Sequence, residues 1–385
     1  MRFLHTGDWH VGRPLRGRSR LDEFADALDF VVTVAAHEEV DAVLLAGDIY
    51  DQRVISADAD RLLFQTLLRL AERQIQVVAV PGNHDSAARL SAFAPLLERI
   101  GAHVVARVVP PSEGAVVHVG ARSGDEHAAI ACLPFVSPRR FADAAGLFED
   151  TAKGYVDFDD GMARILQAYE DAFEADAVNI VLSHVFVSGA QPGGSEREIT
   201  IGADYAVSPQ HLPATASYIA LGHIHKPQRV RGVAAEARYC GSLLQLDFGE
   251  RGQDKSLAVV DVAPGKPPRV TEVPIDAGRP LMDVTGSLAE LEAIASRNPN
   301  AYLRVNLEIE RATPGIADQV RKLLPNALDV RLVLPDSGEP SQERPSMRGL
   351  DPRAQFVAYY RAHDGSEPPE EILAAFERVF DEATV

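Results

Sequence analysis

The sequence has little cysteine and no long apolar run, and both absences narrow the classes of protein it can encode. Only two cysteines, Cys132 and Cys240, occur in 385 residues. They lack the short spacing of a zinc site, so we expect two small buried side chains and other ligands at any metal site. No stretch of about eighteen apolar residues is present, which argues against a membrane-spanning helix. The first residues, Met1–Asp8, lack the apolar core of a signal peptide, so a soluble cytoplasmic protein is expected.

Positive charge is also scarce. The chain has 38 Lys and Arg residues against 56 Asp and Glu residues, which gives a formal net charge of −18. A free-standing nucleic-acid binder is usually basic, so this balance argues against such a protein. It does not exclude one, because carboxylates gathered around metal ions attract cations and a partner subunit can supply a positive surface.

What the sequence does contain is short apolar runs separated by amphipathic stretches. Its 46% hydrophobic content allows a sizeable core. Residues 3–6, 42–46 and 77–80 are predicted strands, and apolar residues recur at helical spacing around 21–35 and 62–70. Alternation of strand and helix is typical of a parallel sheet, in which ligands bind at the carboxyl ends of the strands.

The pattern changes along the chain and predicts four parts. Residues 1–275 are expected to form the main domain, and 276–335 a separate small domain with the order β-α-β-α-β. Residues 336–349 are rich in Pro, Ser, Gly and charge and are predicted to be a linker. Residues 350–385 are predicted to form two helices, each with an apolar stripe. Because two helices alone cannot bury both stripes, they either dock on the main body or bind a partner helix.

Side chains with metal-binding chemistry follow five of the predicted strands. In an extended backbone, residues two apart point to one side, so the Asp-x-His and His-x-His pairs each present two ligands together. A glycine before four of these ligands permits a sharp turn and close approach of the backbone. Carboxylate, amide and imidazole ligands suit Mn²⁺, Fe²⁺ or Zn²⁺ better than Ca²⁺. The segments are Gly7-Asp8-Trp9-His10, Gly47-Asp48-Ile49-Tyr50-Asp51, Gly82-Asn83-His84-Asp85, Ser183-His184 and Gly222-His223-Ile224-His225.

The number of candidate ligands favours two metal ions over one. The five segments offer seven ligands, too many for one tetrahedral ion but suited to two ions that share a carboxylate. Such ions lie about 3.5–4 Å apart and hold the oxygens of a displacement at phosphorus. Each segment alone is more often structural, since an Asn-His-Asp turn is ordinary. All five together, each at a strand end, favour a catalytic centre.

The ordered motifs Gly-Asp-x-His, Gly-Asp-x-x-Asp, Gly-Asn-His-Asp, a later His and Gly-His-x-His resemble those of the calcineurin-like metallophosphoesterases. The runs His5–Arg13 and Gly222–Gln228, the domain order and the tail are similar to the SbcCD family of double-strand-break repair nucleases. The resemblance covers nearly the whole chain. It implies a four-layer α/β/β/α sandwich over 1–275, a small α/β capping domain that binds DNA, and C-terminal helices that bind the coiled coil of an SbcC-type ATPase.

The resemblance also implies roles for the candidate ligands. One metal ion would be held by Asp8, His10 and His225. The other would be held by Asn83, His184 and His223. Asp48 would bridge the two ions, which the family resemblance suggests are Mn²⁺.

His84, in the same resemblance, would not bind metal. It would contact the scissile phosphate and stabilise or protonate the leaving oxygen. Asp85 is a candidate to hold the His84 ring and Asp51 to support the ligands of the first ion, unless both are solvated turn carboxylates. Trp9 lies between two ligands and is expected to pack beneath the site.

Basic residues next to the metal motifs are candidates for DNA contact, because arginine suits the phosphate backbone. The alternative is that they belong to solvated loops. The better candidates directly follow the first motif, Gly7–His10. The residues after the last motif, Gly222–His225, are weaker candidates and include Arg229 and Arg231. The main candidates are Arg13, Arg16, Arg18, Arg20 and Lys226.

The sequence therefore predicts a metal-dependent DNA nuclease. The resemblance implies a 3′→5′ exonuclease on duplex ends and an endonuclease on single strands and hairpins, acting in DNA end processing, repair and recombination. It also implies a homodimer that forms a heterotetramer with the ATPase, at the nucleoid and without a membrane partner. Two alternatives stay open. One is another calcineurin-like phosphodiesterase or phosphatase, and the other is a non-catalytic module that tethers DNA ends.

Overall fold

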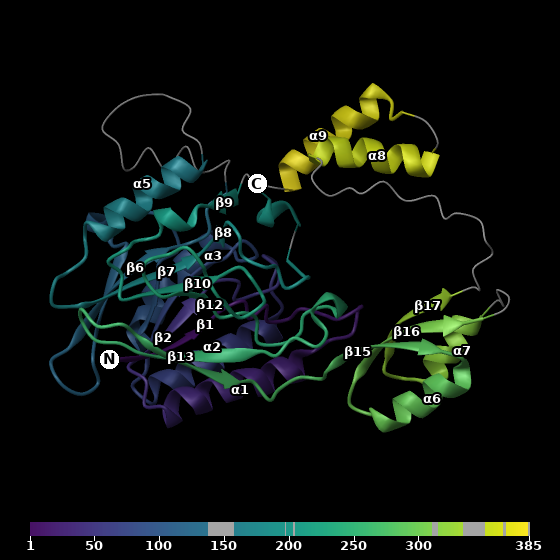
Figure 1. Cartoon of the computed structure of the whole chain (residues 1–385), viewed down its shortest axis with the longest axis horizontal. Helices are drawn as coiled ribbons and strands as arrows, with labels where there is room; N and C mark the ends of the chain where they lie inside the picture. Colours follow the sequence, from purple (N-terminus) through teal and green to yellow (C-terminus); the bar gives the residue numbers. More distant parts are fainter. Residues whose placement is uncertain are drawn as a thin grey trace. The chain divides into compact units, whose positions relative to one another are not determined.

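Two units make up the chain in the computed structural model, Met1–Val333 and Leu334–Val385 (Figure 1). The structure describes residues 1–137, 158–196, 198–202, 205–309, 315–333, 351–364 and 367–383. Among these residues, no helix combines the length and the apolar character needed to pass through a membrane.

The first sheet contains the three N-terminal strands that carry metal motifs. Its order is β14-β13-β1-β2-β3-β4, with β1 to β4 parallel and the β13–β14 hairpin added antiparallel beside β1. The predicted strand and helix alternation is thus confirmed. The strands are β1 (Arg2–Thr6), β2 (Ala42–Ala46), β3 (Gln76–Val80), β4 (Ala102–Val104), β13 (Ser256–Asp261) and β14 (Arg269–Pro274).

Three helices connect the parallel strands of this sheet. The Ser56 side chain accepts a hydrogen bond from the Ala59 backbone N–H and so caps α2, while Asp58 and Asp60 in its first turn complement the helix dipole. The helices are α1 (Leu21–His37), α2 (Ala57–Ala71) and α3 (Ala87–Leu97).

The second sheet has the order β11-β12-β10-β7-β6-β5. Its four central strands, β12, β10, β7 and β6, are parallel, and an antiparallel strand lies at each edge. The strands are β5 (Val116–Gly120), β6 (His127–Leu133), β7 (Val178–His184), β10 (Tyr218–Gly222), β11 (Gln228–Arg229) and β12 (Ala237–Tyr239), and helix α5 spans Phe158–Glu170. A separate pair, β8 (Phe186–Val187) and β9 (Ala206–Val207), lies outside both sheets.

Alternate side chains along the strands show that the two sheets pack face to face. Phe3 and Leu44 of the first sheet share one core with Ile180 of the second. Their neighbours face outward instead: Leu4 packs against α1 and α2, and Val181 packs in the core that contains α5. This is the predicted four-layer α/β/β/α sandwich. Each buried aliphatic side chain contributes roughly 1.5–3 kcal/mol, and the resulting rigidity fixes the strand ends.

A small domain follows the sandwich. It consists of β15 (Leu281–Gly286), α6 (Leu288–Arg297), β16 (Tyr302–Glu308), α7 (Ile316–Leu323) and β17 (Ala327–Val333), with the three strands parallel. A capping box between Ser287 and Glu290 starts α6. Tyr302 and Leu281 of this domain join Leu15 and Phe248 of the sandwich in one apolar cluster.

The second unit contains helices α8 (Pro352–Asp364) and α9 (Glu370–Ala383). Phe356 of α8 stacks on Phe376 of α9 with a centroid distance of 4.2 Å. Ile372, Tyr359 and Val379 nevertheless keep 41%, 54% and 61% of their surface exposed. The two helices therefore bury only part of their apolar surface against each other, as their short length predicts.

Candidate metal centre

The seven predicted ligands lie at or just beyond the carboxyl ends of five strands from both sheets. Asp8, Asp48 and Asn83 follow β1, β2 and β3. In the second sheet, His184 is the last residue of β7, and His223 comes directly after β10. Because the two sheets pack face to face, the loops after these strands meet at one edge of the sandwich.

The backbone at four ligands is strained. Asp8, His10 and Asp48 each have a φ of 47°, and His223 has a φ of 101°, a region that residues other than glycine rarely adopt. The extended backbone expected for the Asp-x-His pair is therefore wrong, since the left-handed conformation of both residues directs their side chains. Such conformations cost about 1–3 kcal/mol each and persist where the surrounding fold imposes them, commonly at functional sites.

Two of the motif glycines are needed for close approach. A Cβ on Gly82 would overlap the carboxylate and backbone of Asp48, and a Cβ on Gly222 would overlap the Ala46 carbonyl. Neither glycine has a positive φ. Without a side chain, Gly82 lets the loops after β2 and β3 approach each other, and Gly222 lets the second sheet approach β2 of the first. Among the motif glycines, Gly47 makes its turn with a φ of 83°.

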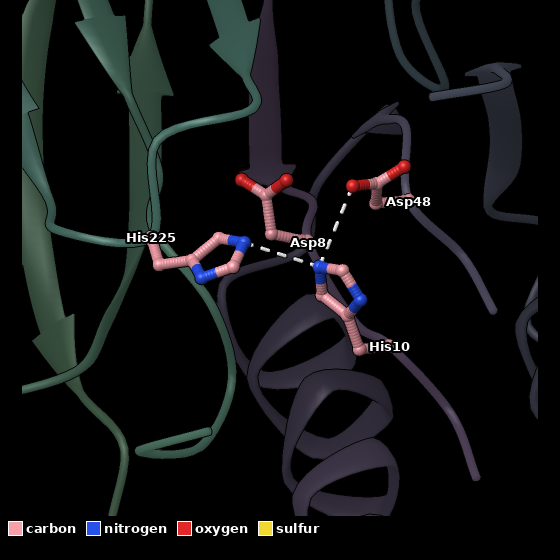
Figure 2. A group of neighbouring side chains, drawn as sticks. All are labelled: Asp8, His10, Asp48 and His225. Atoms are coloured by element: carbon pink, nitrogen blue, oxygen red, sulfur yellow. Dashed lines mark hydrogen bonds and ion pairs between the residues drawn. The ribbon is translucent and has the colours of Figure 1, made fainter. Parts of the chain in front are cut away.

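The first group of ligands consists of Asp8, His10, Asp48 and His225, all buried, with one ligand atom from each within 4.8 Å of the others. Figure 2 shows the His10 ring between Asp48 and His225. The His10 Nε2 atom lies 3.1 Å from Nε2 of His225 and 3.4 Å from Oδ2 of Asp48. This is the set that the sequence assigned to one metal ion.

The second group consists of Asn83, His184 and His223 together with Asp48. The Asn83 Oδ1 atom lies 3.1 Å from Nε2 of His184 and 2.9 Å from Nδ1 of His223. Those two nitrogens are 3.2 Å apart. Oδ2 of Asp48 lies 3.5 Å from the His184 Nε2 atom, so one oxygen faces both groups, as a shared ligand must.

The opposite nitrogen of each ring determines which atom offers a lone pair. Nδ1 of His184 donates to the Ala46 carbonyl at 2.8 Å, and Nε2 of His223 donates to the Thr200 carbonyl at 3.0 Å. A carbonyl oxygen only accepts hydrogen bonds, so the proton of each neutral ring lies on that nitrogen. The nitrogen that faces the centre then carries a lone pair.

In the first group, Nδ1 of His225 faces a Glu250 carboxylate oxygen at 3.0 Å, while Nδ1 of His10 lies 3.5 Å from the Asp51 carboxylate and has no hydrogen-bond partner among the described residues. The Nε2 atom of His10 lies 3.1 Å from that of His225 and 3.4 Å from Oδ2 of Asp48. Nitrogen and oxygen donors gathered in this way suit divalent transition-metal ions. The residues present therefore fit two metal ions.

Burial keeps three of these imidazoles neutral. It lowers the pKa of His10 and His184 below the ordinary value, and that of His223 to about 3. Burial also raises the pKa of Asp8 well above its usual range. For Asp48, burial acts in the same direction, but the nearby imidazoles outweigh it and hold the pKa below the usual value. The neutral rings of His10, His184 and His223 and the ionised Asp48 are the protonation states that metal binding requires, whereas at His225 the Glu250 carboxylate outweighs burial and raises the pKa.

His84 lies beside the centre without belonging to either group. Its backbone N–H donates to Oδ1 of Asp48 at 2.8 Å, and its ring lies edge-on to His10 with a centroid distance of 4.6 Å. Nδ1 of His84 is 2.6 Å from the Asp51 carbonyl, so this nitrogen carries a proton. In the neutral ring, Nε2 then carries the lone pair.

The prediction that Asp85 holds the His84 ring is wrong. The Asp85 carboxylate accepts hydrogen bonds from the backbone N–H groups of Gly82 (2.8 Å), Tyr50 (3.0 Å) and Ile49 (3.1 Å). Both oxygens are used in joining the loops after β2 and β3, and the Asp51 carbonyl orients the His84 ring instead. Burial, followed by the charge of Asp48, raises the pKa of Asp85 to about 7.

The arginines of the first motif have different surroundings. Arg20 is 3% exposed, pairs with Glu23 at 2.9 Å and donates to the Gln245 carbonyl at 2.6 Å, so its predicted DNA contact is wrong. Arg18 lies over the Tyr302 ring of the small domain at 5.3 Å. Only Arg13 stays near the ligands, 3.5 Å from the Asp51 carboxylate.

The remaining basic candidates lie on the surface near the last motif or the small domain. Arg16 is 3.5 Å from Asp247 and 4.0 Å from Asp329, and its side chain is 41% exposed. Lys226 donates to the Gln191 side chain at 3.3 Å in an exposed position. Neither arrangement tests the predicted contact with DNA.

Several supporting residues were not predicted from the sequence. Ser195 Oγ lies 2.7 Å from Nδ1 of His225, and the Glu196 carboxylate accepts the His225 backbone N–H at 2.9 Å. Glu250 and Lys255 complete this network. No spacing relative to the metal motifs marks them, since they come from loops that only the fold brings together. Trp9, by contrast, is fully buried as predicted, and its Nε1 donates to Thr6 Oγ1 at 2.8 Å.

Comparison with known proteins agrees with this geometry. The Calcineurin-like phosphoesterase family matches residues 1–227, and the Type 5 capsule protein repressor C-terminal domain matches residues 277–364. Three similar proteins carry the name of the D subunit of nuclease SbcCD. The protein of Bacillus subtilis (strain 168) is 34% identical over 96% of this chain and 95% of its own length. Those of Rhodobacter capsulatus and Escherichia coli (strain K12) are 30% and 29% identical, over 94% and 89% of this chain and 94% and 87% of their own lengths.

Proposed function

Since the chain belongs to the calcineurin-like phosphoesterases and, among them, to the D subunits of SbcCD nucleases, we propose that it cleaves phosphodiester bonds of DNA with two divalent metal ions. One observation carries the proposal. Oδ2 of Asp48 lies 3.4 Å from the ligand nitrogen of His10 and 3.5 Å from that of His184. A single carboxylate oxygen shared by two ligand sets suits an in-line displacement at phosphorus.

The protein residues have distinct tasks in this reaction. Asp8, His10 and His225 would hold the first ion and Asn83, His184 and His223 the second, with Asp48 available to both. When bound, the two ions neutralise the charge that develops on the phosphate and lower the pKa of water. Nitrogen and oxygen ligands without a thiolate suit Mn²⁺, Fe²⁺ or Zn²⁺, and Mn²⁺ is the proposed ion because the family resemblance favours it.

His84 is the proposed contact to the leaving group. Because the Asp51 carbonyl holds Nδ1 at 2.6 Å, Nε2 is the atom available to the phosphate. A protonated ring can donate through Nε2 without losing the bond to Asp51. Hydrogen bonding or proton transfer at the leaving oxygen contributes typically about 10²–10⁴-fold to the rate.

The substrate class rests on the relatives and on the basic candidates that are not buried. The proposed phosphate contacts are Arg13, Arg16, Arg18 and Lys226. The proposed activities are 3′→5′ exonuclease cleavage of duplex ends and endonuclease cleavage of single strands and hairpins. The proposed complex is a homodimer that binds an SbcC-type ATPase through the C-terminal helices, located in the cytoplasm at the nucleoid.

A nuclease assay tests the proposal directly. Linear duplex DNA labelled at one 5′ or one 3′ end is incubated with the full chain and Mn²⁺, in parallel with a 2′,3′-cyclic nucleotide and a phosphopeptide. We expect cleavage of DNA, progressing from the 3′ end, and loss of cleavage on chelation of the metal. The Asp48→Asn variant is the matched negative control, since it keeps the size of the side chain. Turnover of the small substrates alone would support a different phosphoesterase.

A further inference from the structure

A short helix, η7 (Phe248–Glu250), has contacts with two different parts of the molecule. Phe248 is fully buried in the apolar cluster that joins the small domain to the sandwich. Glu250, only two residues later, is fully buried beside the metal ligand His225. Few residues separate these contacts, so a shift of one requires a shift of the other or a distortion of the helix.

Glu250 makes contacts with both of its oxygens. Oε1 lies 3.0 Å from Nδ1 of His225, and Oε2 accepts from the Lys255 ammonium at 2.7 Å and from the Leu246 backbone N–H at 3.0 Å. The Lys255 ammonium also donates to the His225 carbonyl at 2.8 Å. A buried carboxylate with these partners has little freedom, and it fixes both the orientation and the proton position of the His225 ring.

The small domain contacts the same segment on its other side. The Phe248 ring packs with Leu281 and Tyr302, and the Arg304 guanidinium lies 5.3 Å from its centroid. Arg251, directly after Glu250, pairs with Asp283 of β15 at 3.0 Å. The small domain thereby contacts the same segment that contains Glu250, the residue that orients the His225 ring.

We propose that Asp247–Arg251 is a positioning segment through which docking of the small domain sets the orientation of His225 and the affinity of the centre for the ion held by Asp8, His10 and His225. Glu250 is the positioning residue, and Phe248 and Arg251 link it to the small domain. The inference rests on the proposed function only in that it needs two metal sites. A substitution that shifts the small domain would then alter the affinity for this ion even though the substituted residue does not contact a metal ligand.

Isothermal titration of the metal-free full chain with Mn²⁺ tests the proposal independently of cleavage. The variants are Glu250→Gln, Phe248→Ala and Arg251→Ala. Arg321→Ala is the matched control for Arg251→Ala, since it removes an exposed ion pair with Asp318 within the small domain, where neither residue contacts the segment. Circular dichroism and thermal unfolding show whether each variant keeps the native fold.

We expect Glu250→Gln to weaken one of two Mn²⁺ sites by about 10–100-fold, the usual effect of losing a residue that supports a metal-bound histidine. Phe248→Ala and Arg251→Ala should weaken the same site by a smaller factor, and Arg321→Ala should bind as the unchanged chain does. Wild-type Mn²⁺ affinity in a folded Arg251→Ala and a folded Phe248→Ala would overturn the proposal. If Phe248→Ala does not fold, the Mn²⁺ affinity of Arg251→Ala alone decides whether the proposal holds. Two Mn²⁺ sites without DNA cleavage would contradict the proposed function but leave this inference intact.

Discussion

Asn83 and His84 are adjacent in one loop but have different roles. Oδ1 of Asn83 faces the ligand nitrogens of His184 and His223, so a neutral oxygen completes the second ligand set. The His84 ring is held through Nδ1 by the Asp51 carbonyl, and its Nε2 is the atom proposed to contact the substrate. A neutral ligand at position 83 leaves the shared negative charge to Asp48.

Replacement of His84 by alanine separates binding from catalysis. We expect His84→Ala to bind Mn²⁺ and DNA as the unchanged chain does and to lose cleavage by about 10²–10⁴-fold, because only contact with the leaving oxygen is removed. Titration with Mn²⁺, a DNA-binding assay and single-turnover cleavage measure the three properties. Cleavage at the original rate would rule out the leaving-group role.

Two arginines of one loop offer a matched pair for stability and DNA binding. Arg20→Ala removes the cationic partner of the buried Glu23, which keeps its hydrogen bonds from the Tyr302 hydroxyl and the Arg279 backbone N–H, so we expect it to lower the free energy of unfolding by about 1–3 kcal/mol. Arg13→Ala, at the partly exposed edge of the metal centre, should change stability by less than about 0.5 kcal/mol and weaken DNA binding with a smaller salt dependence. Urea unfolding and DNA titration at several salt concentrations check both. Equal stability of the two variants would contradict the structural role of Arg20.

The C-terminal tail consists of helices α8 and α9, and two helices are too few to form a hydrophobic core. Phe356 and Phe376 stack on each other, yet Tyr359, Ile372 and Val379 of the same helices stay substantially exposed. Exposed apolar residues clustered on short helices are typical of a surface that binds another protein. This pattern supports the proposed contact with a coiled-coil partner.

Deletion of residues 350–385 tests the tail as a whole. We expect the truncated chain to retain Mn²⁺-dependent cleavage and to lose co-purification with an SbcC-type ATPase, because every ligand of the centre lies before residue 226. Val379→Glu is a milder variant that should weaken the complex without unfolding the tail, since the side chain is 61% exposed. A stable complex with the truncated chain would show that the ATPase binds elsewhere.

Metal binding is expected to stabilise the whole sandwich, because the ligands come from five strands of two sheets. Each ion present at about 100 times its Kd adds about 2.7 kcal/mol to the free energy of unfolding, provided that the unfolded chain does not bind it. We therefore expect Mn²⁺ to raise the Tm by several degrees and a chelator to reverse the change. Calorimetry of Asp48→Asn with and without Mn²⁺ provides the control, and its Tm should respond much less.

Much of the centre could be predicted from the sequence because each ligand adjoins a strand end. The strands at 3–6, 42–46 and 77–80 appear as apolar runs, and parallel pairing brings their carboxyl ends to one edge. The βαβ order, the four layers, the β-α-β-α-β order of residues 281–333 and the buried Trp9 follow from the same local patterns. These features depend on residues close together in the chain, where periodicity and spacing are visible.

The tertiary structure alone decided the roles of Asp85, Arg20 and Glu250. Arg20 bonds to the Gln245 carbonyl and Glu250 to a histidine in another loop, and no local pattern records such distant pairs. The backbone at Asp8 and Asp48 is left-handed, a conformation that Asp adopts more readily than most residues but that persists only where the surrounding fold imposes it. The sequence by itself determined which residues are candidates for metal binding; the fold determined which atom of each side chain faces the centre and which residues hold it in place, because that depends on contacts between loops far apart in the chain.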